Sequence, residues 1–413
     1  MKKHLIIAAA AVLGAMSLQA QPNVLKEAER AMKDGKTPAE VVAIITPAFT
    51  DPATDSLAQT YFIPGKSMFS QYDEFYALKQ FNKLPENGDL TMANDLLGGY
   101  DYFMRALPLD SIPNEKGKIK PKYSKEIYNT LAGHYGDYNT AALIFWEAKD
   151  FANAYNSWQI FLNLVDNPVV RPMLSSVPAD TILGEICYNQ AIAAWQAENL
   201  PAALKAFQSA KARGYNKKQL YDYAIAVAAN MQDDEAAYNW ALEAQPLYGS
   251  EDPSYIGFII NHFLVAQEFD KAFNMINEAI ANDPDNAQYY LVKGILYDNQ
   301  KNMPEARAMF EKAVSLDNQN WQALYQLGRS LCEEAYALSD SAPTSPAESQ
   351  AFFETKIVPL FKQAAEYLEQ SWNINNDNTD ALRYLDNVYY NLRDEANKKD
   401  VEQRMAAAGM AVD

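Results

Sequence analysis

The feature of this 413-residue sequence that most constrains its fold is a run of alanines at a nearly constant spacing. Ala203, Ala237, Ala272 and Ala306 follow one another at intervals of 34, 35 and 34 residues. Self-similarity at a fixed period of about 20–50 residues is the signature of stacked repeat architectures. In these architectures a single repeat cannot bury its apolar face alone, so neighbouring repeats stack and share a core. The spacing therefore predicts a chain of short stacked units.

The clearest unit spans residues 286–320 and is expected to form two short amphipathic helices joined by a tight turn. Apolar and small residues recur at helical spacing on one face of each helix. They are Tyr290, Gly294 and Tyr297 in the first helix and Ala306, Phe310 and Ala313 in the second. Small residues allow two helix backbones to approach closely, while aromatic rings fill the space around them. The unit therefore predicts a helical hairpin.

This pattern resembles the tetratricopeptide repeat, a helix–turn–helix unit of about 34 residues. The family has a small residue at the eighth position, alanine at the twentieth and twenty-seventh, and an aromatic or aliphatic residue at the twenty-fourth. The residues that carry these packing positions are Ala203, Phe207, Ala210, Ala237, Ala272, Ala279, Gly294, Ala306, Phe310, Ala313 and Gly328. The resemblance implies an all-α solenoid of such hairpins, wound as a right-handed superhelix.

The resemblance is strongest over residues 184–320, where four regular units are expected, and it is looser elsewhere. The other segments are degenerate hairpins at 21–107, a lysine-rich loop at 108–123, a degenerate repeat with a proline-rich insertion at 124–183, a repeat with a long inter-helix insertion at 321–376 and a polar capping hairpin at 377–413. The insertion at 339–349 is expected to lengthen both helices of its repeat and to join them by a mobile loop. The Lys116–Lys125 cluster favours a solvated loop, with docking of an acidic partner as the alternative.

Two residues near the N-terminus bear on helix boundaries. Thr37 precedes Pro38 and is expected to cap the helix that begins there. Pro64 falls inside the next expected helix, where a proline predicts either a bend or a later helix start.

The first 20 residues have two lysines, an apolar run from Leu5 to Leu13 and small residues near their end. This is typical of a secretory signal peptide, with cleavage expected near Ala20. Removing Lys2 and Lys3 changes the formal net charge from −18 to −20. An acidic surface repels nucleic-acid phosphates and anionic lipids, and no later segment is long and apolar enough to span a bilayer. We therefore expect an exported, soluble, periplasmic or secreted protein that binds no nucleic acid and does not insert into membranes.

Residues that could support catalysis are sparse. Cys187 and Cys332 lie in different repeats, so two separate buried thiols are expected instead of a disulfide. His134 and His262 also lie in different hairpins. Metal-ligand spacing, a nucleophile elbow and a glycine-rich phosphate loop are all missing from the sequence. We therefore expect that the protein is not an enzyme and that it has no catalytic residue, metal or cofactor.

By resemblance to the family, the second, fifth, ninth, twelfth and thirteenth positions of each repeat face a concave groove. Aromatic and polar residues at these positions are Asn139, Trp146, Tyr188, Trp195, Gln196, Asn230, Asn261, Asn299, Tyr325 and Arg329. Aromatic anchors beside amides suit an extended peptide, because amides can pair its backbone groups. Only Arg329 is basic, so a grip on a terminal carboxylate by several cations is not expected.

The sequence thus favours a non-catalytic scaffold or adaptor that binds a protein or peptide in the groove. Carbohydrate binding on tryptophan and tyrosine platforms is the alternative, although no cysteine follows the signal peptide to anchor a surface glycan receptor through lipid. A third possibility stays open, in which the tryptophans only pack between neighbouring helices.

Overall fold

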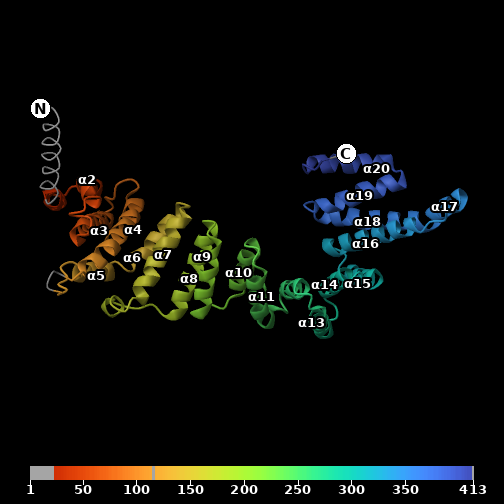
Figure 1. Cartoon of the computed structure of the whole chain (residues 1–413), viewed down its shortest axis with the longest axis horizontal. Coiled ribbons are helices and arrows are strands. Elements are labelled where there is room, and N and C mark those ends of the chain that lie inside the picture. Colours follow the sequence, from red (N-terminus) through yellow and green to blue (C-terminus); the bar gives the residue numbers. More distant parts are fainter. Residues whose placement is uncertain (1–22, 114–116, 412–413) are drawn as a thin grey trace, which may run out of the picture. The chain divides into compact units, whose positions relative to one another are not determined.

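A computed structural model describes residues 23–113 and 117–411. The expected signal peptide and Lys116 lie outside the described residues. Within the described ranges the regular structure is helical, and successive helices fold back on one another as hairpins (Figure 1). This confirms the all-α fold class. In the same ranges, no helix combines the length and apolar character needed to cross a membrane.

The chain divides into two compact units, one ending at Met231 and the other beginning at Gln232. The boundary falls inside the predicted range of regular repeats, 184–320. After a helical segment at 23–33, the first unit contains α2 (Pro38–Ile45), η1 (Thr46–Phe49), α3 (Ala58–Gln80), α4 (Gly88–Asp110), α5 (Ser124–Gly133), α6 (Asp137–Glu147), α7 (Phe151–Asp166), η2 (Arg171–Met173), α8 (Asp180–Gln196), α9 (Leu200–Ala212) and α10 (Lys218–Asn230).

The second unit continues with the same kind of hairpin. Its elements are α11 (Asp234–Tyr248), α12 (Ser254–Val265), α13 (Phe269–Asn282), α14 (Ala287–Asn299), α15 (Met303–Leu316), α16 (Trp321–Asp340), α17 (Pro346–Phe352), the π-helical turn η3 (Phe353–Ile357), α18 (Val358–Ile374), α19 (Thr379–Leu392) and α20 (Glu395–Ala407).

The turn inside each regular hairpin uses one recurring local structure. A non-glycine residue in the left-handed region ends the first helix, and the next residue starts the second. These left-handed residues are Lys149, Glu198, Gln232, Gln267, Lys301 and Arg393, with φ between 55° and 62°. At four of the turns the following residue, Asp150, Asn199, Asp233 or Asp394, accepts a hydrogen bond from the backbone N–H of the third residue of the second helix. Such a cap satisfies an N–H group that would otherwise be unpaired at the helix start.

Glycine at the eighth repeat position is explained by close helix contact. A Cβ atom on Gly294 would lie 2.4 Å from Cε1 of Phe310 and 3.1 Å from the carbonyl oxygen of Ala306. A Cβ on Gly328 would lie 2.7 Å from Cγ of Leu368. The alanines and phenylalanines at the later signature positions are buried, apart from Ala279, which is only half-buried against the core around Ile276. The periodic small residues therefore set the distance between the two helices of a hairpin.

Two helical glycines of the second unit should respond to alanine with opposite signs. Gly294→Ala is expected to lower the free energy of unfolding by about 1–2 kcal/mol, because the added methyl group overlaps Phe310. Gly257→Ala is the matched control: no atom lies within 4 Å of its added Cβ, so the higher helix propensity of alanine should stabilise by about 0.5–1 kcal/mol. Urea unfolding followed by circular dichroism measures both. Stabilisation by both variants would contradict the tight contact.

Of three boundaries expected from the sequence, one agrees with the structure and two differ in detail. Thr37 caps α2 as predicted, in a capping box with Glu40. The later start suggested by Pro64 is wrong, because α3 begins at Ala58 and continues through this buried proline. The expected loop at 108–123 begins only after α4 ends at Asp110, whose carboxylate accepts the backbone N–H groups of Lys122, Tyr123 and Ser124 at 2.7–2.9 Å.

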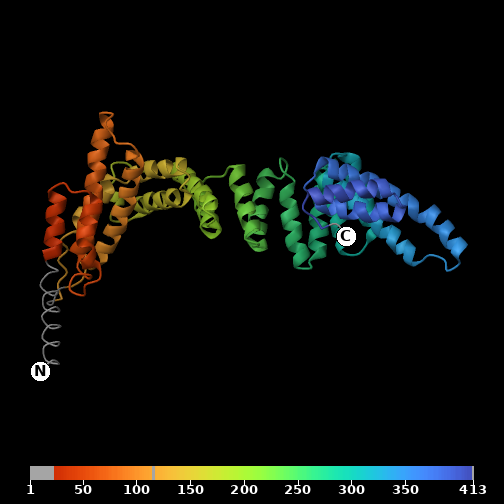
Figure 2. The same ribbon diagram turned by 90° about the horizontal axis from the view of Figure 1, so that it is seen from above.

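The insertion of the second unit lengthens both helices of its repeat, as expected. Helix α16 reaches Asp340, and a helical course resumes at Pro346 and passes through η3 into α18. The connecting loop is therefore 341–345, shorter than the stretch 339–349. Figure 2 shows this lengthened arm extending past the α19–α20 hairpin. Cys187 and Cys332 are both buried and unpaired, as predicted.

Candidate functional site

Helices α6 and α8 are each the first helix of a hairpin in the first unit. They carry the same kinds of residue at the same spacing. Each has an amide or a tyrosine, then an aliphatic residue four positions later, then a tryptophan three positions after that. The two sets are Asn139, Leu143 and Trp146 on α6 and Tyr188, Ile192 and Trp195 on α8. Residues at i, i+4 and i+7 share one face of a helix, so each helix presents one continuous apolar and aromatic stripe.

Trp158 of α7 fixes the first of these stripes. Its ring is buried, and its Nε1–H donates a hydrogen bond to Oδ1 of Asn139 at 2.8 Å. The Trp146 ring lies 6.4 Å from Trp158 and meets Phe151 edge-on at 5.1 Å, measured between ring centroids. The amide oxygen of Asn139 is therefore used to hold an indole ring. Trp146 is held in place by two neighbouring rings while remaining partly exposed.

The second stripe belongs to a cluster of tyrosines. Tyr188 stacks on Tyr215 at 4.7 Å and lies nearly parallel to Tyr223 of α10 at 6.3 Å. Trp195 lies 5.5 Å from the same Tyr223 ring. Burial raises the pKa of Tyr188 to about 12, and the neighbouring Tyr215, Tyr223 and Asp222 add to the effect. The Tyr188 hydroxyl is therefore protonated at neutral pH and available as a donor.

Between the two stripes lies a pocket of ≈ 410 Å³, here named the aromatic pocket. It is lined by Leu143, Trp146, Trp158, Tyr188, Asn189, Ile192 and Tyr223. None of these side chains is an acid or a base that is charged at neutral pH. Ligand pockets are typically about 300–1,000 Å³ and mainly apolar, with a few polar groups that fix orientation. The aromatic pocket has both properties.

The other predicted groove residues do not line this pocket. Gln196 and Asn230 are exposed on the first unit. Asn261, Asn299, Tyr325 and Arg329 belong to the second unit, where Asn261 is exposed and Asn299 donates a hydrogen bond to the carbonyl of Ile295 in its own helix. These four residues therefore do not join the aromatic pocket.

Arg329, the one basic groove candidate, is already paired. Its guanidinium forms ion pairs with Asp298 of α14 and Glu333 of α16, both at 2.5 Å, and its Nε donates to Gln326. The carboxylate of Asp298 comes from the preceding hairpin, so this pair ties α14 to α16. The nearby Tyr325 ring meets Tyr384 edge-on at 6.0 Å. These contacts give Arg329 and Tyr325 roles in packing between repeats.

Sequence reasoning missed several residues of the aromatic pocket. Leu143 and Ile192 occupy the ninth position of their repeats, which the family resemblance includes, but aromatic and amide residues were preferred. Leu143 follows Asn139 by four residues and Ile192 follows Tyr188 by four residues, and this helical spacing could have identified both. Tyr223 follows Tyr188 by 35 residues, about one repeat, and this recurrence was a usable signal. Trp158 comes from a second helix, so a rule based on first helices could not identify it.

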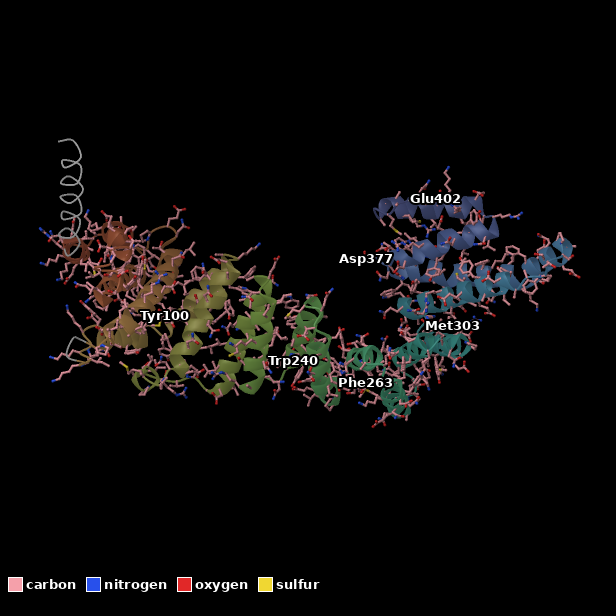
Figure 3. The ribbon with its side chains drawn as sticks, in the orientation of Figure 1. Tyr100, Trp240, Phe263, Met303, Asp377 and Glu402 are labelled. Carbon is pink, nitrogen blue, oxygen red and sulfur yellow. The ribbon has the colours of Figure 1, made fainter. Side chains whose placement is uncertain are left out.

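The two described histidines are packing residues. The Nδ1–H of His134 donates a hydrogen bond to the carboxylate of Asp137 at 2.9 Å, and the ring stacks on Phe69. His262 stacks on Tyr238 with ring centroids 3.9 Å apart and meets Phe263, which Figure 3 labels on α12, edge-on. Across the described ranges, no group of three or more His, Cys, Asp or Glu side chains could hold a metal ion.

Comparison with known proteins identifies the repeat. The family model described as tetratricopeptide repeat matches residues 259–321. No curated protein sequence matches the chain.

Solved structures with related helical hairpins include three proteins of low sequence identity. YrrB, described as a TPR protein with an unusual peptide-binding site, is 16% identical, with a TM-score of 0.33 over 46% of this chain and 89% of its own. The C-terminal part of a TPR repeat-containing protein from Cytophaga hutchinsonii is 13% identical, with a TM-score of 0.37 over 64% and 93%. A TPR repeats protein from Bacteroides fragilis is 17% identical, with a TM-score of 0.30 over 62% and 98%.

Proposed function

Because this chain is a tetratricopeptide-repeat protein, we propose that it is a non-catalytic scaffold which binds a segment of a partner protein in the aromatic pocket. The observation that carries the proposal is the convergence of four aromatic rings and two aliphatic side chains around one open pocket. Proteins rarely leave such an apolar surface accessible unless it binds something.

The aromatic pocket has the composition of a binding hot spot. Tryptophan and tyrosine dominate the residues whose truncation costs binding energy at protein interfaces. The hydrogen bond between Trp158 and Asn139 and the rings around Trp146 hold these side chains before any ligand arrives. A pocket ordered in advance loses less conformational entropy on binding. The arrangement therefore suits insertion of apolar side chains from a partner segment.

Polar groups in the pocket favour a polypeptide over a sugar. Aromatic platforms could stack on a sugar ring, but each sugar hydroxyl group also donates a hydrogen bond, and the pocket offers few side-chain oxygens to accept it. Asn189 is the single amide that lines the pocket, and the Oδ1 of the nearby Asn139 already accepts a bond from Trp158. A glycan is therefore kept as an outcome of the experiment below.

The proposal predicts that two pocket side chains are needed for partner binding. Leu143 and Tyr223 are 48% and 37% exposed, so Leu143→Ser with Tyr223→Ala should leave the fold intact. Partners crosslinked to the wild-type protein in intact cells would be identified, purified and titrated against each variant. Truncating a hot-spot residue costs about 2 kcal/mol of binding free energy or more. A tenfold loss of affinity corresponds to about 1.4 kcal/mol, so affinity is expected to fall at least tenfold.

A matched control is available in the second unit. Leu242 and Tyr336 are 42% and 37% exposed, so Leu242→Ser with Tyr336→Ala changes the same residue types at similar exposure. This control is expected to bind the partner as the wild type does. Equal affinity of the folded pocket variant and the wild type would refute the assignment of the pocket. Binding of polysaccharides in a glycan array, lost in the pocket variant, would replace the protein partner by a carbohydrate.

A further inference from the structure

The hydrogen-bonding groups around the aromatic pocket are mostly donors without partners. Among the described residues, the indole N–H groups of Trp146 and Trp195 and the hydroxyls of Tyr188 and Tyr223 make no hydrogen bond within the protein. An indole nitrogen can only donate, and a protonated phenol hydroxyl can donate or accept. The site therefore favours a ligand that brings more acceptors than donors.

The uncharged lining of the aromatic pocket disfavours ligands that carry a charge. The pocket lining has no side chain that is charged at neutral pH. Asp222, the acidic residue that influences Tyr188, forms an ion pair with Lys218 at 2.9 Å. A charged side chain inserted among the rings would lose its hydration without gaining a counter-ion, which is costly. The residues that enter the pocket are therefore expected to be uncharged.

One kind of polypeptide segment satisfies both requirements. A proline residue has no backbone N–H, and a polyproline II helix makes no internal hydrogen bonds, so its carbonyl groups are all free to accept. Its pyrrolidine rings pack flat on aromatic faces, and its fixed backbone loses little entropy on binding. An ordinary extended peptide would bring one N–H donor per residue, and the pocket offers few acceptors to receive them.

We propose that the aromatic pocket binds a proline-rich partner segment in the polyproline II conformation, with indole and phenol groups donating to its carbonyls. This rests on the proposed function, since it specifies the chemistry of the segment that the scaffold holds. The pairing of flat aromatic rings with unpartnered donors is the observation that separates this ligand from a leucine-rich helix, which has no free carbonyls along its length.

The test uses the whole chain and an acetylated, amidated decaproline peptide as the probe. Isothermal titration and tryptophan fluorescence should show binding to the wild-type protein and to the Leu242→Ser, Tyr336→Ala control. Binding is expected to weaken at least tenfold in the Leu143→Ser, Tyr223→Ala variant. A Trp146→Phe variant keeps a ring in the pocket lining and removes one donor, and it should weaken binding by a smaller factor of roughly 3–10, as expected for one hydrogen bond.

Three comparison ligands make the outcomes distinct. A Gly-Ser decapeptide tests generic peptide binding, an oligolysine peptide tests cation binding to the rings, and the crosslinked partner tests the proposed function. If decaproline does not compete with the partner for binding, the proline inference is overturned and the scaffold function stands. Failure of the partner to depend on the pocket would overturn both. Equal affinity for decaproline and for the Gly-Ser peptide would also reject the proline inference.

Discussion

Phe310→Ala is expected to lower the free energy of unfolding by about 3–5 kcal/mol, the cost typical of removing a buried phenylalanine from a core. Phe310 is fully buried in the hairpin formed by α14 and α15. Its ring lies directly against Gly294, which has no side chain to fill the space that alanine would leave. The cavity would therefore persist. Equilibrium urea unfolding followed by circular dichroism measures the loss.

Tyr390→Ala provides the control for this prediction. Tyr390 belongs to the same unit, on α19, and 68% of its surface is exposed. Removing its ring should change the free energy of unfolding by less than about 0.5 kcal/mol, as is usual for surface substitutions. If Phe310→Ala cost no more than Tyr390→Ala, the packing of the ring against Gly294 would not contribute to stability. A repeat unit that melts separately would appear as an additional transition in the same experiment.

The repeat fold could be predicted from the sequence because its packing contacts lie within one hairpin. Gly294 and Phe310 are 16 residues apart, and each is required by the other's size. The periodic alanines likewise report a local contact between two adjacent helices. Such contacts leave a fixed spacing in the sequence, and that spacing was sufficient to identify the family.

The candidate site could be predicted only in part, because it depends on contacts between hairpins. Of the predicted groove residues, Trp146 and Tyr188 line the aromatic pocket, whose lining also includes Trp158 from a second helix and Tyr223 from the next repeat. The ion pair of Arg329 with Asp298, 31 residues earlier, is likewise a contact between hairpins that the repeat spacing does not reveal. Periodicity indicates which face of its helix a residue occupies. It does not indicate which residues of a neighbouring hairpin contact that residue.

Asp95 is a further residue whose environment is set by packing between long helices. It lies on α4, is only 7% exposed, and its Oδ2 has no hydrogen-bond partner among the described residues. Burial raises the pKa of its carboxyl from the usual 3.8 to about 7. A carboxylate at this position is therefore unfavourable in the folded protein, because it loses hydration without gaining a partner.

Asp95→Asn is expected to stabilise the protein at alkaline pH and to do so less at acidic pH. The folded pKa lies above the unfolded one, so the folded state binds the proton more tightly. The contribution of the Asp95 carboxyl to the free energy of unfolding is therefore fully present below about pH 4 and is lost as the pH rises to about 7. A shift of about 3 pKa units corresponds to roughly 4 kcal/mol, which is the largest gain expected of the variant at pH 8.

Urea unfolding at pH 5, 6, 7 and 8 tests this prediction through the difference between variant and wild type. The difference should increase with pH and level off above pH 7, whatever constant offset the asparagine amide adds. Asp101→Asn is the control, because Asp101 is an exposed carboxylate on the same helix and its replacement should give a flat difference over this range. A flat difference for Asp95→Asn as well would mean that water reaches the Asp95 carboxylate in the folded protein and keeps it charged. The packing of α3, α4 and α6 around Asp95 would then be looser than the burial of this residue indicates.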